Sequence, residues 1–312
     1  MRVRTEAGLN WGIVLAGGAG TRLSALSRTD DGVPAPKQYC SLVGGQPLLL
    51  AALERAERVL PRERIVIVVA EEHVQHWGPL LSEWPTRNVL VQPSNRGTAS
   101  GVLFPLLSIL ERDPRARVAL FPSDHFVERE AVLERCLRSS LDAGHELERN
   151  VILLGITPDG AEPDYGWILP GPACGATRSV EAFVEKPGVP QAAELQSLGA
   201  VWNSFLLVAS GPTLVGLYKR RLPKLLEAFQ AARPHASIEA ARSFYKDVAY
   251  SDFSRDVLED SERLLRLLVV PSCGWTDLGT PERVVRCRTR QRSIVQRQPN
   301  SLPDAGIQRS AT

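Results

Sequence analysis

Short apolar runs alternate with longer segments of helical pattern in the first half of the chain. The runs cover residues 12–16, 65–69, 118–121 and 151–155, and each is bounded by Gly, Pro or Asp. The segments between them are long enough for crossover helices, which join parallel strands. The pattern therefore predicts an α/β protein with a mostly parallel sheet.

One of the intervening helices is visible from its apolar face. Pro105 lies inside this segment and predicts a kink or a shifted helix start. The apolar side chains that share one side of the helix are Val102, Leu103, Leu106, Leu107 and Leu110.

After about residue 160 the alternation loosens. Strands are expected at residues 165–169, 179–184 and 201–208, followed by a helical region at 213–233. A last strand at 267–270 leads through a loop to a helix, with Thr280, Pro281 and Glu282 as N-cap, first-turn proline and early acidic residue. We expect one domain over residues 1–295 and a polar, disordered tail over 296–312.

Composition and charge exclude several classes of protein. The 312 residues carry a formal net charge of +2, far from the basicity of nucleic-acid-binding domains, so no nucleic-acid partner is expected. Residues 1–10 are charged and the longest apolar runs are strand-length, so neither a signal peptide nor a membrane span is expected. The five cysteines are scattered without a CxxC pair, which argues against a disulfide framework and a zinc site. A reducing, cytoplasmic location is expected.

A glycine-rich segment, residues 16–23 (AGGAGTRL), directly follows the first predicted strand. Its glycines let backbone amides approach a ligand closely, and a concavity of amides at a helix N-terminus suits phosphate oxygens. Arg22 adds a permanently charged fork that can hold phosphate in two-point geometry. The candidate phosphate-binding residues are Ala16, Gly17, Gly18, Gly20, Thr21 and Arg22.

The glycine-rich segment alone leaves other interpretations open. A dinucleotide-binding fingerprint would need a third glycine, but position 23 is Leu. A P-loop would continue with Gly-Lys-Ser or Gly-Lys-Thr, which is absent here. A plain tight turn without a ligand is the remaining alternative.

The segment that follows points to a known family. Gly-Gly-x-Gly-Thr-Arg-Leu followed by Pro36-Lys37-Gln38 resembles the opening of the sugar nucleotidyltransferases, and the Pro-Lys-Gln form with residues 26–28 (LSR) is similar to the mannose-1-phosphate guanylyltransferase branch. This resemblance implies a Rossmann-like mixed, mainly parallel sheet flanked by helices, the nucleotide-diphospho-sugar transferase fold. It also implies a nucleotide-binding half at about 10–155, with Lys37 at the phosphates, and a sugar-binding half at about 156–295. An isolated Lys37 would more often be a solvated surface residue.

Seven later segments follow the order of this family up to about residue 285. The first, residues 92–99 (QPSNRGTA), resembles the guanylyltransferase base-binding loop, which would place Gln92, Gly97 and Thr98 at the edge of guanine. A site built on such hydrogen bonds rejects a base that lacks them by about 10⁴-fold or more. Many members of the branch have Glu where this chain has Gln92. Asn95 and the residues after it also suit a helix cap, and the two interpretations are compatible.

Two carboxylates stand in segments that resemble the family's Mg²⁺ site. Asp124 follows a predicted parallel strand, where open α/β sheets bind ligands, and Asp277 lies in a segment similar to the family's Trp-Ser-Asp-Val-Gly element. Two carboxylates about 4 Å apart repel by about 4 kcal/mol at an effective dielectric constant of about 20. Mg²⁺ would remove that cost. An isolated Asp at a strand end is more often a turn residue, and the adjacent His125 is equally compatible with a structural role.

Two further segments resemble the sugar-binding elements of the family. Residues 164–168 (DYGWI) look like its Tyr-Gly-Tyr-Ile strand, which would place Tyr165 and Gly166 along the sugar. Residues 183–187 match its Phe-Val-Glu-Lys-Pro motif without a mismatch. The resemblance implies that Glu185 accepts hydrogen bonds from sugar hydroxyls and that Lys186 neutralises the sugar phosphate.

The last two segments match less closely. Residues 202–205 (WNSF) resemble Trp-Asn-Ser-Gly, with Asn203 as a sugar ligand and Phe205 in place of the usual glycine. Residues 250–254 resemble Ser-Ile-Asp-Tyr, which places Asp252 near the pocket. The guanylyltransferases often carry an additional isomerase or β-helix domain, and this chain is too short for either, so no isomerase activity is expected.

The resemblance implies an Mg²⁺-dependent attack by a sugar 1-phosphate on the α-phosphorus of GTP. The expected sugar phosphate is mannose 1-phosphate. A homodimer is one assembly to consider. Gln92 and Phe205 leave open another pair, such as UTP or dTTP with glucose 1-phosphate. A catalytically silent, nucleotide-sugar-sensing subunit and a nicotinamide-dependent dehydrogenase are the alternatives from other classes. The residues needed for catalysis are present, and the third fingerprint glycine of a dehydrogenase is absent.

Overall fold

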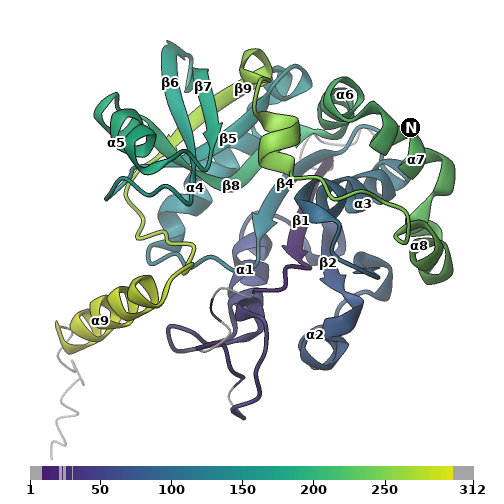
Figure 1. Ribbon diagram of the computed structural model, residues 1–312, viewed down its shortest axis with the longest axis horizontal. Coiled ribbons are helices and arrows are strands. Elements are labelled where there is room, and N and C mark those ends of the chain that lie inside the picture. Colours follow the sequence, from purple (N-terminus) through teal and green to yellow (C-terminus); the bar gives the residue numbers. More distant parts are fainter. Residues whose placement is uncertain (1–8, 21–22, 24–25, 30, 298–312) are drawn as a thin grey trace, which may run out of the picture.

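A mixed sheet runs through the computed structural model, which describes residues 9–20, 23, 26–29 and 31–297 (Figure 1). Its nine strands in these residues are ordered β3-β2-β1-β4-β8-β5-β9-β7-β6. The strands are β1 (Asn10–Ala16), β2 (Ile65–Ala70), β3 (Val89–Gln92), β4 (Arg117–Pro122), β5 (Val151–Ile156), β6 (Gly166–Cys174), β7 (Thr177–Glu185), β8 (Val201–Ser210) and β9 (Leu265–Val270).

Most strands point in one direction. β3, β2, β1 and β4 pair in parallel, as do β5 and β9. β8 is antiparallel to β4 and β5, and β7 is antiparallel to β6 and β9. The prediction of an α/β fold with a mixed, mainly parallel sheet is confirmed.

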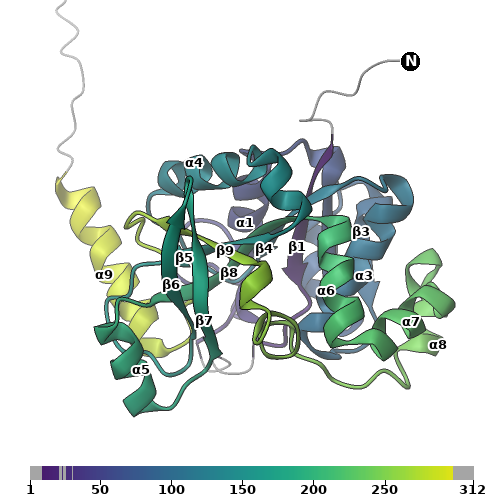
Figure 2. The ribbon, with the colours of Figure 1, turned by 90° about the horizontal axis from the view of Figure 1, so that it is seen from above.

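Helices cover both faces of the sheet. The α-helices are α1 (Leu48–Glu57), α2 (Val74–Leu80), α3 (Gly97–Arg112), α4 (Glu130–Leu141), α5 (Val189–Ser197), α6 (Gly211–Arg221), α7 (Pro223–Ala232), α8 (Ile238–Phe244) and α9 (Pro281–Arg297). Alternate strand residues enter two cores: Ile13 joins one that contains residues of α3, α6 and α7, and Val14 joins one that contains residues of α1 and α4. In both Figure 1 and Figure 2, α9 lies at the edge of the molecule.

The strand β8 pairs with both β4 and β6 along one edge, so the sheet curls around it. Its first residues, Val201 and Trp202, pair with β6, whereas its later residues pair with β4 along the same edge. Phe205, between these two parts, has a left-handed φ of 59°, and the β5–β8 register shifts opposite it. This irregularity brings the start of β6 and the end of β7 to the cavity at the carboxyl ends of β1 and β4.

Several predicted elements differ from the structure. Pro105 does not set the start of α3, which begins at Gly97 and continues past the proline to Arg112. The helical region expected at 213–233 is confirmed and consists of two helices, because Leu222 leaves the helical conformation before Pro223. The four-residue strand β3 was not predicted from the pattern. The helix after Thr280 is confirmed as α9, which includes residues 296–297 of the predicted tail; residues 298–312 lie outside the described part.

None of the helices in the described ranges combines the length and the apolar character that crossing a membrane requires.

Candidate functional site

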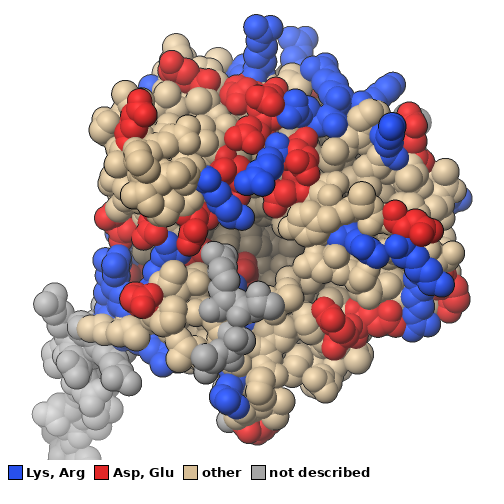
Figure 3. Space-filling view, viewed as in Figure 1, with Lys and Arg blue, Asp and Glu red and all other residues tan. Residues whose placement is uncertain are grey.

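A cavity of about 290 Å³ opens where β1 and β4 end and where β6, β7 and β8 meet. Figure 3 shows a hollow in this face of the molecule, with acidic and basic side chains gathered at its rim. Residues predicted from both halves of the chain line the cavity together: Gly18, Thr98, Asp124, Tyr165, Gly166, Glu185, Lys186, Asn203 and Asp277.

Side chains from the turn at Lys37–Tyr39 hold the glycine-rich loop after β1 by hydrogen bonds. Gln38 Nε2 donates hydrogen bonds to the carbonyl oxygens of Ala16 (3.2 Å) and Gly18 (2.6 Å), and the Tyr39 hydroxyl donates to Ala16 O (2.9 Å). Gly20 has a φ of 62°, and a Cβ there would lie 2.9 Å from the backbone nitrogen of Lys37, so this position requires glycine. Thr21 and Arg22, predicted to bind phosphate, lie outside the described residues.

Lys37 is a buried lysine rather than a solvated one, with 6% of its surface exposed. Its Nζ lies 3.0 Å from Asp124 Oδ2 and donates a hydrogen bond of 2.7 Å to the main-chain oxygen of Asp277. The short helical turn Lys37–Tyr39 therefore connects the glycine-rich loop to the carboxylate of Asp124 and to the backbone of Asp277.

The two carboxylates are ionised groups in a partly buried setting. Burial raises the pKa of Asp124, but the opposing effect of the Lys37 ammonium and of His125 is larger and brings the pKa below its ordinary value. Burial likewise raises the pKa of Asp277, whereas the hydrogen bond from Tyr165 and the charges of Lys37 and Arg283 bring it below its ordinary value. Both side chains thus carry negative charge at neutral pH.

The His125 ring packs against Trp275 and lies next to Asp124. Its ring meets the Trp275 ring edge-on at 5.0 Å, and its Nε2 lies 3.6 Å from Asp124 Oδ1. Burial lowers the pKa of His125 to about 4, although the nearby Asp124 charge opposes this shift. The imidazole is therefore neutral near pH 7, and its packing fits a structural role.

The carboxylates suit a cation that is shared with a substrate. No group of three or more His, Cys, Asp or Glu side chains in the described residues is arranged to hold a metal ion alone. Mg²⁺, however, commonly binds one or two carboxylates and takes its other oxygens from water and substrate phosphates. Asp124 and Asp277, both ionised and both lining the cavity, fit that donor set.

The predicted sugar-binding residues converge at the junction of β6, β7 and β8. Gly166 pairs with Glu185, and a Cβ on Gly166 would lie 2.6 Å from Glu185 Oε2 and 3.1 Å from Asn203 Cβ. Lys186 has a left-handed φ of 50°, and its backbone nitrogen donates to Tyr165 O at 3.2 Å. The Lys186 side chain is half exposed, with Nζ 3.6 Å from Glu185 Oε1. This strained turn points a carboxylate and an ammonium to the same cavity.

The pKa of the Glu185 carboxyl is higher than that of an ordinary glutamate. Burial raises its pKa, the Lys186 charge lowers it, and the Asp252 charge raises it again, to a net value of about 7. Glu185 can therefore accept or donate hydrogen bonds near neutral pH, depending on its protonation state.

The predicted base-binding loop is anchored to a distant segment. Gly97 has a φ of 85°, and a Cβ there would overlap the main-chain oxygen of Ser251. Asn95 Oδ1 accepts a hydrogen bond from Gly97 N (2.9 Å), while the α3 N-cap, Arg96, makes no side-chain capping bond. The Thr98 hydroxyl donates to Asp252 Oδ2 at 3.3 Å.

Gln92 lies deeper than this loop. Its Nε2 donates to the Tyr245 hydroxyl at 2.8 Å, and a Cβ added to Gly17 would lie 2.8 Å from its Oε1. The Gln92 side chain therefore lies between the glycine-rich loop and the buried Tyr245 rather than among the residues that line the cavity.

Several residues at the site were not predicted from the sequence. Gln38 and Tyr39 hold the glycine-rich loop, and only their proximity to Lys37 in the chain gave a signal. Tyr245, which contacts Gln92, is brought in by the tertiary structure, whereas Arg283 lies close to Asp277 in the chain, in the first turn of the helix that follows it. Ser254 lies 3.5 Å from Asn203 Nδ2 and lines the cavity.

The chain is similar to known proteins over most of its length. The model of the nucleotidyl transferase family matches residues 11–292. The xanthan biosynthesis protein XanB of Xanthomonas campestris pv. campestris (strain B100) is 28% identical over 86% of this chain and 57% of its own length. The mannose-1-phosphate guanylyltransferase of Sinorhizobium fredii is 28% identical over 86% of this chain and 52% of its own length.

A solved structure gives a similar result. A Thermus thermophilus protein described as a mannose-1-phosphate geranyltransferase has a TM-score of 0.76 and 31% identity, over 87% of this chain and 76% of that one. The chain spans a little more than half the length of the curated relatives it matches.

Proposed function

Because the chain belongs to the nucleotidyl transferase family, we propose that it transfers a guanylyl group from GTP to α-D-mannose 1-phosphate, which yields GDP-mannose and pyrophosphate. One observation carries the reaction class: the buried Lys37 contacts both Asp124 and Asp277, which line the cavity together with Lys186. The choice of mannose 1-phosphate and GTP is supported by relatives described as mannose-1-phosphate guanylyltransferases.

The chemistry would depend on positioning and charge neutralisation. A phosphate monoester oxygen of the sugar phosphate attacks the α-phosphorus, the bond to the pyrophosphate oxygen breaks, and the attacking group needs no strong base because it is already charged. Lys186 would hold the sugar phosphate, and Glu185 and Asn203 its sugar hydroxyls. Arg22, Lys37 and the amides of residues 17–21 would stabilise the leaving pyrophosphate.

Asp124 and Asp277 would hold Mg²⁺ in this scheme. A bound Mg²⁺ supplies positive charge to phosphate oxygens and orients them toward one another. Lys37 would keep the two carboxylate segments together, since its ammonium contacts the side chain of one and the backbone of the other.

The resemblance to the family assigns the guanine edge to the loop that begins at Gln92. The Gln92 side chain itself does not line the cavity, because its amide nitrogen is bonded to the Tyr245 hydroxyl and its Oε1 lies beside Gly17. The choice of GTP therefore rests on the relatives and not on this side chain. The second candidate is the same reaction with UTP or dTTP and glucose 1-phosphate, because Phe205 lines the cavity where the family motif has glycine and alters the pocket wall.

The test is pyrophosphate release from each of GTP, dTTP, UTP, ATP and CTP with mannose 1-phosphate or glucose 1-phosphate and Mg²⁺. We expect the highest kcat/KM for GTP with mannose 1-phosphate, and loss of turnover in the Asp124→Asn variant. Preference for another pair would overturn the specificity but retain the reaction class. Absence of turnover with every pair, together with nucleotide-sugar binding, would support a regulatory subunit instead.

A further inference from the structure

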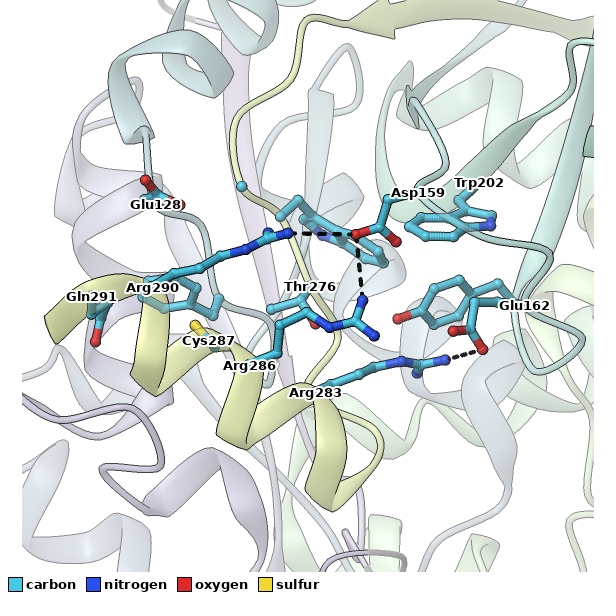
Figure 4. A pocket seen from close by; sticks show the side chains of 14 residues that line it. Glu128, Asp159, Glu162, Trp202, Thr276, Arg283, Arg286, Cys287, Arg290 and Gln291 are labelled. Atoms are coloured by element: carbon cyan, nitrogen blue, oxygen red, sulfur yellow. Dashed lines mark hydrogen bonds and ion pairs between the residues drawn. The ribbon is translucent and has the colours of Figure 1, made fainter. Parts of the chain in front are cut away.

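Arg283 lies in the first turn of α9. It contacts Asp277 and Tyr165, which line the cavity, but it does not line this cavity itself. Its Nη1 donates to Asp277 Oδ1 at 2.8 Å, and its Nη2 donates to Glu162 Oε2 at 2.5 Å. Its guanidinium carbon lies 4.4 Å from the centre of the Tyr165 ring. Figure 4 shows Arg283 reaching from α9 toward Glu162. With only 9% of its surface exposed, this side chain is held on three sides.

The Asp277 carboxylate is held asymmetrically. Oδ1 accepts hydrogen bonds from Arg283, from the Tyr165 hydroxyl (2.6 Å) and from Gly279 N (2.9 Å). Among the described residues, Oδ2 accepts none. Three donors on one oxygen fix the rotation of the carboxylate and leave the other oxygen available to a ligand.

We infer that Arg283 is a positioning residue that, with Tyr165, fixes the orientation of the Asp277 carboxylate for a divalent cation. This inference rests on the proposed role of Asp277 in binding Mg²⁺. Hydrogen bonds behind a metal ligand orient it, and their removal costs about 10–100-fold in metal affinity or activity. Arg283 does not contact the substrate in this assignment and acts only through Asp277.

Two neighbouring arginines provide an internal comparison. Arg286 and Arg290 line the same small cavity of about 40 Å³ beside α9 as Arg283 does (Figure 4). Both pair with Asp159, at 3.6 and 4.0 Å, and both side chains are 57% exposed. Since neither arginine is hydrogen-bonded or ion-paired to Asp277 in the described residues, removal of either charge should leave the carboxylate in place. A cavity of this size admits a few waters and no larger ligand.

The test compares Arg283→Gln with Arg286→Gln in the full-length chain. We expect Arg283→Gln to lower kcat/KM by about 10–100-fold and to raise the Mg²⁺ concentration for half-maximal rate by about tenfold. Arg286→Gln should change either value by less than about twofold. Mn²⁺ binding in the presence of GTP, followed by electron paramagnetic resonance, gives a readout that needs no turnover and should weaken for Arg283→Gln but not for Arg286→Gln.

Tyr165→Phe keeps the ring beneath Arg283 and removes one hydroxyl, so it tests the same assignment if Arg283→Gln does not fold. It should weaken Mn²⁺ binding in the same direction. The effects of Arg283→Gln and Tyr165→Phe should also be non-additive, since both changes act through Asp277 Oδ1.

The role of Asp277 is tested separately with Asp277→Asn. If Asp277→Asn keeps wild-type activity and Mn²⁺ binding, the proposed cation site is wrong. If Asp277→Asn loses Mn²⁺ binding but Arg283→Gln and Tyr165→Phe both retain it, the positioning role is overturned while the cation site stands.

Discussion

Lys37 Nζ lies 3.0 Å from Asp124 Oδ2 and 2.7 Å from the main-chain oxygen of Asp277, a residue 240 positions further along the chain. One ammonium thus connects the segment after the glycine-rich loop, the end of β4 and the loop that follows β9. Lys37 is buried, whereas Asp124 is partly exposed to the cavity. The protein therefore shields this ion pair from solvent on the Lys37 side but not on the Asp124 side.

Replacement of Lys37 should therefore disable the site more than the fold. We expect Lys37→Met to lower kcat by about 10²–10³-fold, as loss of one fixed donor to developing charge commonly does. The measurement is steady-state pyrophosphate release at saturating substrates. Lys224→Met, which alters an exposed lysine on α7, is the matched control, and equal kinetics for the two variants would contradict the assignment.

The close approach of Gly166 to Glu185 and Asn203 predicts a steric effect. A methyl group on Gly166 would lie 2.6 Å from Glu185 Oε2, so Gly166→Ala should displace the carboxylate from the cavity. We expect kcat/KM for the sugar phosphate to fall by about 10–100-fold, because displacement of a binding group by about 1 Å has effects of this size. Gly160→Ala, where a Cβ meets no atom within 4 Å, should behave like the parent.

The raised pKa of Glu185 predicts a pH-dependent stability. The native state binds this proton more tightly than the unfolded chain does, with a pKa of about 7 against an ordinary 4.5. The contribution of Glu185 to the free energy of unfolding is therefore fully favourable below about pH 4.5 and is lost as pH rises through about 7. Glu185→Gln should gain roughly 1–3 kcal/mol relative to the parent between pH 5 and pH 8, measured by urea unfolding.

The control for this experiment is Glu181→Gln, which changes an exposed glutamate on the same strand. Its stability relative to the parent should not change between the two pH values. A Glu185→Gln variant that behaves in the same way as Glu181→Gln would contradict the shifted equilibrium.

The two phosphate-binding residues of the proposed mechanism should have separable effects. Lys186→Ala should mainly raise KM for the sugar phosphate, because Lys186 lies beside Glu185 at the sugar end of the cavity. Arg22→Ala should mainly lower kcat, because Arg22 is assigned to the leaving pyrophosphate. Initial-rate measurements with each substrate varied in turn separate the two, and unchanged kinetics in both variants would refute these roles.

Local sequence was sufficient for the elements that buried apolar runs define. The strands β1, β2, β4 and β5 are continuous apolar runs covered on both faces, and such runs are visible without knowledge of their partners. β3 was missed because it has four residues at the sheet edge, and the break between α6 and α7 was missed although Pro223 was a signal for it.

The candidate residues of the site were also identified from the sequence. Their short motifs resemble those of a known family and can be recognised without knowledge of the surrounding fold. Their mutual arrangement was decided only by the tertiary structure. The contacts of Lys37 with Asp124, of Arg283 with Asp277 and of Gln92 with Tyr245 bring together different elements of the fold. No local pattern encodes the contacts of Lys37 with Asp124 and of Gln92 with Tyr245, since these residues are far apart in the chain and meet only in the folded protein. The pKa shifts follow from the same packing, because burial and neighbouring charges exist only in the folded protein.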